Sequence, residues 1–154
     1  MHSILCLQRE VIEEHDLYVI SDEIYSELTY TGNHVTIASL PGMKERTVLI
    51  NGFSKSYAMT GWRLGYACAP KVILQQMLKI HQFAIMCAPT TSQYAAVEAL
   101  RNGDEDVAEM REAYDERRKY LVKAFISPSV YYVFQLHIIS NMTLFVNSIF
   151  RFNR

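Results

Sequence analysis

Two short and mainly apolar runs, residues 17–20 (LYVI) and 47–50 (TVLI), constrain the fold of this chain more than any other feature of its sequence. Neither run alternates apolar with polar residues, so each predicts a strand that is buried on both faces, as is typical of parallel sheets. Polar segments follow directly, SDEIY at 21–25 and NGFSKS at 51–56. Because open parallel sheets bind ligands at the carboxyl ends of their strands, we expect these two segments to meet at a binding edge.

The residues that follow the second run supply helices that would cover such a sheet. Apolar residues favour one face of the segment 72–83, which we expect to pack on the sheet. The segment 94–100 continues the helical pattern until Gly103 ends it as a C-terminal cap does. Asp104 then begins a charged helix that extends to about residue 125. The predicted fold class is α/β, a mostly parallel sheet with packed helices.

The composition changes sharply near residue 125, because residues 124–150 contain no Asp, Glu, Lys or Arg. Polar residues such as Gln135 and Asn141 interrupt this segment, which disfavours a membrane span. Two or three short strands, or an extension that does not pack, are favoured instead. We therefore predict a domain over residues 1–125 and a divergent, uncharged tail over residues 126–154.

The charge balance excludes several classes of partner. The chain has 15 basic and 16 acidic residues and a formal net charge of −1, so no overall field favours nucleic acid or an anionic membrane. We therefore expect a small-molecule ligand. The five histidines show no metal-ligand spacing, and no metal site is predicted.

The cysteines and the start of the sequence bear on the compartment. The three cysteines are scattered and odd in number, which fits neither a disulfide framework nor a Cys-rich metal site. The first apolar run, residues 4–7, is shorter than an export signal requires. We therefore expect a cytoplasmic protein.

A single lysine follows the second predicted strand and is the candidate nucleophile. Lys55 lies among small hydroxyl residues at the sheet edge, where a partly desolvated amine can lose its proton and attack a carbonyl group. Arg63 follows eight residues later, and a guanidinium group can hold a phosphate through two parallel hydrogen bonds. The pattern predicts an anchor for an anionic ligand beside the nucleophile.

Two longer motifs contain these residues and carry a family resemblance. The segments VISDEIYSELTY (19–30) and NGFSKSYAMTGWRLGY (51–66) resemble the signature of class I aminotransferases of the aspartate and aromatic type. Members of that family are enzymes of fold type I that depend on pyridoxal phosphate. The resemblance implies that amino acids and 2-oxo acids are the substrates and that the full-length protein is a homodimer.

The same resemblance implies a role for each matching residue. Lys55 is implied to bind the cofactor covalently and to act as the acid and base of the reaction. Asp22 is implied to pair with the pyridine nitrogen, and Tyr25 to form a hydrogen bond with the phenolic oxygen. Arg63 is implied to bind the phosphate, and Ser54 is a weaker candidate for cofactor binding. Each role belongs to the family and is carried over by position.

The resemblance covers only residues 11–123, roughly half of the family's cofactor domain. The family's serine and glycine phosphate turn and its ring-stacking aromatic residue have no counterpart in this range. Arg151 and Arg154 do not match the arginine that binds the substrate carboxylate in the family. The chain is therefore expected to correspond to a central fragment of such an enzyme.

Three other interpretations share features of these motifs. A catalytically inactive remnant or interaction domain of such an enzyme, and a pyridoxal-phosphate-dependent lyase of the same fold, both stay open. A phosphate-loop nucleotidase is disfavoured, because its motif requires a glycine directly before the lysine and Ser54 precedes Lys55.

Overall fold

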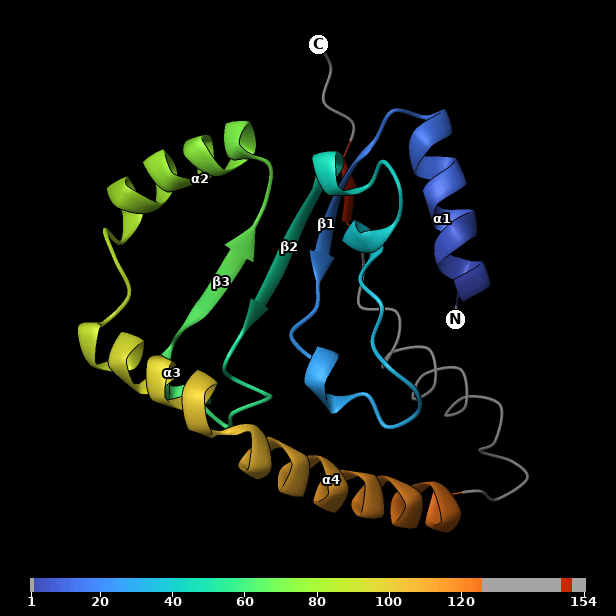
Figure 1. Ribbon diagram of the computed structural model, residues 1–154, viewed down its shortest axis with the longest axis vertical. Helices are drawn as coiled ribbons and strands as arrows, with labels where there is room; N and C mark the ends of the chain where they lie inside the picture. Colours follow the sequence, from blue (N-terminus) through green and yellow to red (C-terminus); the bar gives the residue numbers. More distant parts are fainter. Residues whose placement is uncertain (1, 126–147, 151–154) are drawn as a thin grey trace.

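The computed structural model describes residues 2–125 and 148–150, which form a small sheet and four helices (Figure 1). The helices are α1 (His2–Glu14), α2 (Lys71–Ala84), α3 (Thr90–Asn102) and α4 (Asp104–Phe125). The strands are β1 (Tyr18–Asp22), β2 (Thr47–Gly52), β3 (Gly65–Cys68) and β4 (Ser148–Phe150). Four single-turn 3-10 helices lie between these elements, η1 (Ser26–Leu28), η2 (Ile37–Ser39), η3 (Lys44–Arg46) and η4 (Thr60–Trp62). The α/β class predicted from the sequence is confirmed.

The sheet has the strand order β3-β2-β1-β4. Strands β1 and β2 are parallel, with Asp22 opposite Ile50, as the two apolar runs predicted. Both other pairings, β2 with β3 and β1 with β4, are antiparallel. The prediction of a mostly parallel sheet is therefore wrong, and the sheet is mixed. Between β2 and β3, the connection 53–64 contains only η4 and no crossover helix, so the chain returns at the same end of the sheet.

A first core cluster lies between α1 and the sheet. It consists of apolar side chains that are at most 8% exposed: Ile12, Val19, Ile37, Leu40 and Met43. Val19 is the central residue of β1, so this cluster fixes the position of the strand that leads to Asp22. Burial of these side chains is the main favourable contribution to folding in this half of the chain.

Replacing Met43 by alanine is expected to lower the free energy of unfolding by about 2–5 kcal/mol, because a fully buried side chain leaves a cavity. Urea unfolding followed by circular dichroism measures the change. Met86→Ala is the matched control, since Met86 is 75% exposed and lies outside both core clusters. Equal losses in the two variants would contradict the assignment of Met43 to the core.

A second cluster joins α3 to the loop between β2 and β3. Phe53 and Met59 of this loop are buried against Ala96 of α3. Helix α3 begins directly after Pro89, a residue that is tolerated where a helix starts because it has no N–H to satisfy. The loop that contains Lys55 and Arg63 is therefore held against a helix. In Figure 1, β1 and β2 run toward the side of the molecule where η1, α3 and α4 lie.

Helix α2 differs from its prediction. Its periodic apolar residues were expected to pack on the sheet, but Val72, Ile80 and Phe83 are 74%, 71% and 98% exposed. The helix follows edge strand β3 and lies away from the sheet in Figure 1, so it covers neither face. Periodicity identified the apolar face but did not determine what covers it. In the part of the chain that the structure describes, none of the helices is both long and apolar enough to cross a membrane.

The predicted tail over residues 126–154 falls mostly outside the described residues. Its described part is β4, which pairs with β1 through Ile149 opposite Val19. Before it, α4 ends at Phe125, close to the predicted end of the charged helix.

Candidate functional site

The carboxyl ends of β1 and β2 meet at one edge of the sheet, as the sequence predicted. Asp22 is the last residue of β1, and its register partner Ile50 lies two residues before the end of β2. The amine nitrogen Nζ of Lys55 lies 5.8 Å from the centroid of the Tyr25 ring. The structure therefore brings Tyr25 and Lys55 together, although they are thirty positions apart in the sequence.

Lys55 is half-buried in the turn that follows β2. Within residues 2–125 and 148–150, no carboxylate forms an ion pair with its amine. At this distance the face of the Tyr25 ring attracts the ammonium group of Lys55, and the amine keeps its protons. An amine in this position is not committed to a structural ion pair and can react with a carbonyl group.

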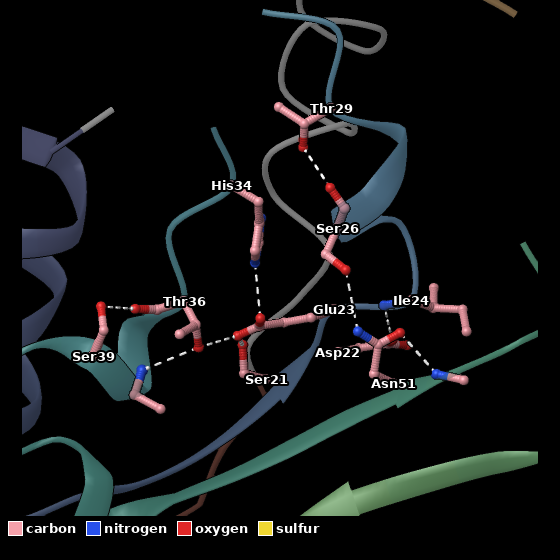
Figure 2. Close-up of polar contacts among 12 residues, drawn as sticks. Ser21, Asp22, Glu23, Ile24, Ser26, Thr29, His34, Thr36, Ser39 and Asn51 are labelled. Atoms are coloured by element: carbon pink, nitrogen blue, oxygen red, sulfur yellow. Dashed lines mark hydrogen bonds and ion pairs between the residues drawn. The ribbon is translucent and has the colours of Figure 1, made fainter. Parts of the chain in front are cut away.

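Asp22 and Asn51 fix the two strand ends relative to the turns that follow them (Figure 2). The Oδ1 atom of Asp22 accepts a hydrogen bond from the backbone N–H of Ile24 at 3.2 Å. Asn51 accepts from the N–H of Gly52 at 2.7 Å and donates to the Oγ atom of Ser26 at 3.1 Å. Asn51 therefore ties the end of β2 to η1, a role that sequence reasoning missed because no local pattern indicates a contact across 25 positions.

Arg63 and Ser54 lie in the same loop as Lys55. The Nη1 atom of Arg63 donates to the carbonyl oxygen of Thr60 at 2.9 Å. The hydroxyl group of Thr60 in turn donates to the carbonyl oxygen of Ser54 at 2.8 Å. Among the described residues, no hydrogen bond or ion pair joins Arg63 to Asp22 or Lys55 directly. Ser54 takes part in this chain of contacts through its backbone, not its side chain.

Close backbone approach holds the two ends of this loop together. A Cβ atom at Gly52 would lie 3.0 Å from both the Cα atom of Gly65 and the carbonyl oxygen of Leu64. The two glycines are register partners in the pairing of β2 with β3. Glycine is needed here because a side chain would push these strands apart.

Glu23 lies between Asp22 and Tyr25 and is the centre of a buried polar network (Figure 2). Its carboxylate accepts hydrogen bonds from the hydroxyl groups of Ser21 and Thr36 and contacts Nε2 of His34 at 2.7 Å. The family motif gave Glu23 no role. The network connects β1 to the segment that precedes η2, and it thereby anchors the turn that contains Asp22 and Tyr25.

The pKa values of Glu23 and His34 move in opposite directions. Burial on its own would raise the pKa of Glu23, but hydrogen bonds from His34 and Thr36, together with the charge of His34, lower it overall. The hydrogen bond to Glu23 raises the pKa of His34, burial opposes this, and the charges of Glu23 and Glu27 add to the increase. Both shifts favour the charged pair.

This pair is expected to stabilise the fold most strongly between about pH 4.5 and pH 6.5, the ordinary pKa values of the two groups. Its contribution is lost as the pH rises through the folded-state pKa of His34, and also as the pH falls through that of Glu23. Urea midpoints measured at about pH 8 and about pH 6 should therefore show that His34→Gln costs more stability at the lower pH. An equal cost of His34→Gln at both pH values would contradict the charged pair.

Within the residues that the structure describes, no group of three or more His, Cys, Asp or Glu side chains could hold a metal ion. The functional groups described at this edge are an amine, a carboxylate, a phenol and a guanidinium group.

Comparison with known proteins identifies the family. The family model described as Aminotransferase class I and II matches residues 5–148, a range that extends into the segment 126–154 where we expected no match. YugH of Bacillus subtilis (strain 168), which is named as an aminotransferase, is 56% identical over 115 residues and is similar to 75% of this chain. The aspartate aminotransferase of Pyrococcus abyssi is 51% identical over 113 residues, or 71% of this chain.

Solved structures agree with these sequence matches. The aromatic aminotransferase from Pyrococcus horikoshii OT3 superposes with a TM-score of 0.77 at 46% identity, over 80% of this chain and 34% of that protein. The chain likewise spans 30% and 29% of the lengths of YugH and the Pyrococcus abyssi enzyme. The predicted resemblance to a central fragment of a fold type I enzyme is confirmed. The chain belongs to the family of class I and II aminotransferases.

Proposed function

We propose that this chain contains the lysine-bearing part of a pyridoxal-phosphate-dependent aminotransferase, which exchanges amino groups between amino acids and 2-oxo acids. The observation that carries the proposal is the position of the Lys55 amine, 5.8 Å from the centroid of the Tyr25 ring at the edge where β1 and β2 end. Membership of the class I and II aminotransferases supports it.

The types of donor and acceptor at this edge fit pyridoxal phosphate. The amine of Lys55 suits an aldehyde carbon, and the carboxylate of Asp22 suits a protonated ring nitrogen. The hydroxyl group of Tyr25 suits a phenolic oxygen, and the guanidinium group of Arg63 suits a phosphate. We assign the cofactor contacts to these four residues and to Ser54, which lies in the same loop as Lys55.

Each of these side chains would have a distinct role. When bound, the cofactor supplies a ring that accepts electrons from the α-carbon of the amino acid. Asp22 would keep the ring nitrogen protonated, and Tyr25 would orient the ring through its hydroxyl group. Lys55 would hold the cofactor and then, at its released amine, carry a proton to and from the substrate α-carbon. Arg63 would bind the phosphate through charge-assisted hydrogen bonds.

We also propose that the whole protein is a cytoplasmic homodimer, and that this chain consists of part of the cofactor-binding domain over residues 1–125 and a divergent tail over residues 126–154. The exposed apolar residues of α2 support an assembly in which further protein covers this helix. The free thiols of Cys6, Cys68 and Cys87 support a reducing compartment. The end of α4 at Phe125 supports the boundary.

Arg63→Ala tests the phosphate site. The variant is expected to bind pyridoxal phosphate at least about tenfold more weakly, because it loses hydrogen bonds to a charged group. Its affinity for pyridoxal, which has no phosphate, should stay unchanged. Both affinities can be measured by titration of the visible absorbance that appears when the carbonyl compound reacts with the chain. Arg101→Ala, which changes an exposed arginine of α3, is the matched control.

An equal loss of affinity for both compounds in Arg63→Ala would contradict the proposed phosphate contact. An absence of any new visible absorbance with the unchanged chain would contradict its ability to form the site alone.

A further inference from the structure

Ser92 makes an unusual contact for a serine in the first turn of a helix. It is the third residue of α3 and is 3% exposed. Its hydroxyl group donates to the carbonyl oxygen of Trp62 at 2.7 Å, across a sequence separation of thirty residues. Serine hydroxyl groups in helices usually bond to the backbone of their own helix or to solvent. Here the hydroxyl group bonds to the loop that contains Arg63.

The acceptor of this bond lies in the peptide group directly before Arg63. Arg63 has a left-handed backbone, with φ 51° and ψ 49°, and ends η4. A non-glycine residue holds this conformation only where its surroundings enforce it. Because the peptide group is planar, an anchored Trp62 carbonyl also fixes the direction of the N–Cα bond of Arg63. The bond from Ser92 therefore acts on the dihedral angle that is strained.

Helix α3 also holds the same turn through an apolar contact. Met59, which precedes η4, is buried in the cluster that contains Ala96 of α3. The N–H group of Trp62 donates to the carbonyl oxygen of Met59 at 3.2 Å, so the turn is closed on itself. The apolar contact fixes where the turn lies, whereas the bond from Ser92 fixes how its last peptide group is oriented. These two effects can be separated by mutation.

We infer that Ser92 is a positioning residue for the phosphate site: its hydrogen bond to Trp62 keeps Arg63 in the left-handed conformation that presents the guanidinium group to the cofactor phosphate. The inference rests on the proposed function, because that function assigns the phosphate to Arg63. Ser92 itself needs no contact with the cofactor.

Ser92→Ala tests this inference through the ratio of two affinities. The full chain with Ser92→Ala should bind pyridoxal phosphate roughly three- to tenfold more weakly, the effect of one lost hydrogen bond, and should bind pyridoxal as before. Ser92→Thr, which keeps the hydroxyl group, should retain the preference for the phosphorylated compound. Ser39→Ala is the matched control, because it also removes a bond of 2.7 Å from a serine to a backbone carbonyl, in a different segment.

The outcomes separate the inference from the proposed function. If Arg63→Ala abolishes the preference for the phosphate and Ser92→Ala does not, the inference is overturned and the proposed function stands. If Arg63→Ala leaves the preference unchanged, the proposed phosphate contact is overturned, and the inference fails with it. A loss of preference in both variants supports both.

A second measurement does not depend on cofactor binding. A residue with positive φ gives a strong intraresidue nuclear Overhauser effect between its amide and α protons. We expect this signal at Arg63 in the unchanged chain and in Ser39→Ala. In Ser92→Ala the signal at Arg63 should be lost, while the amide signals of the rest of α3 stay unchanged. Persistence of the signal in Ser92→Ala would overturn the inference even if the chain binds no cofactor.

Discussion

Replacing Lys55 by alanine is expected to abolish covalent attachment of pyridoxal phosphate at the native site. Lys55 lies at the edge where β1 and β2 end, beside Tyr25 and in the same loop as Arg63. Within residues 2–125 and 148–150, Lys55 is the lysine that lies in the turn following β2, so a carbonyl compound held at this edge is expected to react with its amine. Borohydride reduction of the complex, followed by digestion and mass spectrometry, should place the pyridoxyl group on Lys55 in the unchanged chain and nowhere specific in the variant.

Lys79→Ala serves as the control, because Lys79 lies on the exposed helix α2. Its amine donates a hydrogen bond to the side-chain oxygen of Gln76 in the same helix. This variant should be labelled to the same extent as the unchanged chain. A pyridoxyl group found mainly on Lys44, Lys71 or Lys79 would show that Lys55 has been assigned wrongly.

The isolated chain is expected to show no measurable transaminase turnover, even if it binds the cofactor. It spans only 30% of the length of YugH and 29% of the Pyrococcus abyssi enzyme. Catalysis depends on positioning, and a displacement of about 1 Å can already cost on the order of a hundredfold in rate. The proposed assignments give the described part of the chain a nucleophile and cofactor contacts, but they give it no group that binds the substrate carboxylate.

The measurement is a coupled assay with aspartate, tyrosine and alanine as amino donors and 2-oxoglutarate as acceptor. It should be run on chain that light scattering shows to be free of aggregates, with the Lys55→Ala variant alongside. Turnover that disappears in this variant would refute the prediction. It would show that the short chain assembles a working site, either alone or with further copies of itself.

The sequence predicted those parts of the fold that depend on local patterns. The runs 17–20 and 47–50 correctly predicted parallel neighbours, because a strand buried on both faces has few other places in a fold. The charged helix that begins at Asp104 was also predicted correctly, since an acidic first turn favours a helix start. Because parallel strands end at the same edge of a sheet, the two runs also predicted the edge where Lys55 lies.

Other features depend on contacts that no local pattern encodes. The pairing of Glu23 with His34 joins residues eleven positions apart in an irregular segment, and the bond from Ser92 to Trp62 crosses thirty positions. The left-handed backbone of Arg63 is equally invisible, because arginine has no preference for positive φ. Periodicity could not show that α2 stays uncovered, since the partner of an apolar face is a property of the whole assembly.

The contiguity of β2, the loop 53–64 and β3 has a consequence for the order of events during folding. Lys55, the proposed covalent anchor, and Arg63, the proposed phosphate-binding residue, lie within a single hairpin-like unit that the pairing of Gly52 with Gly65 closes. Contacts that are close in sequence close small loops and form rapidly. Asp22, by contrast, joins this unit only after β1 has paired with β2 across an intervening segment of more than twenty residues. A folding chain would therefore bring Lys55 and Arg63 together before Asp22, so the part of the site proposed for the aldehyde and the phosphate would form before the part proposed for the ring nitrogen.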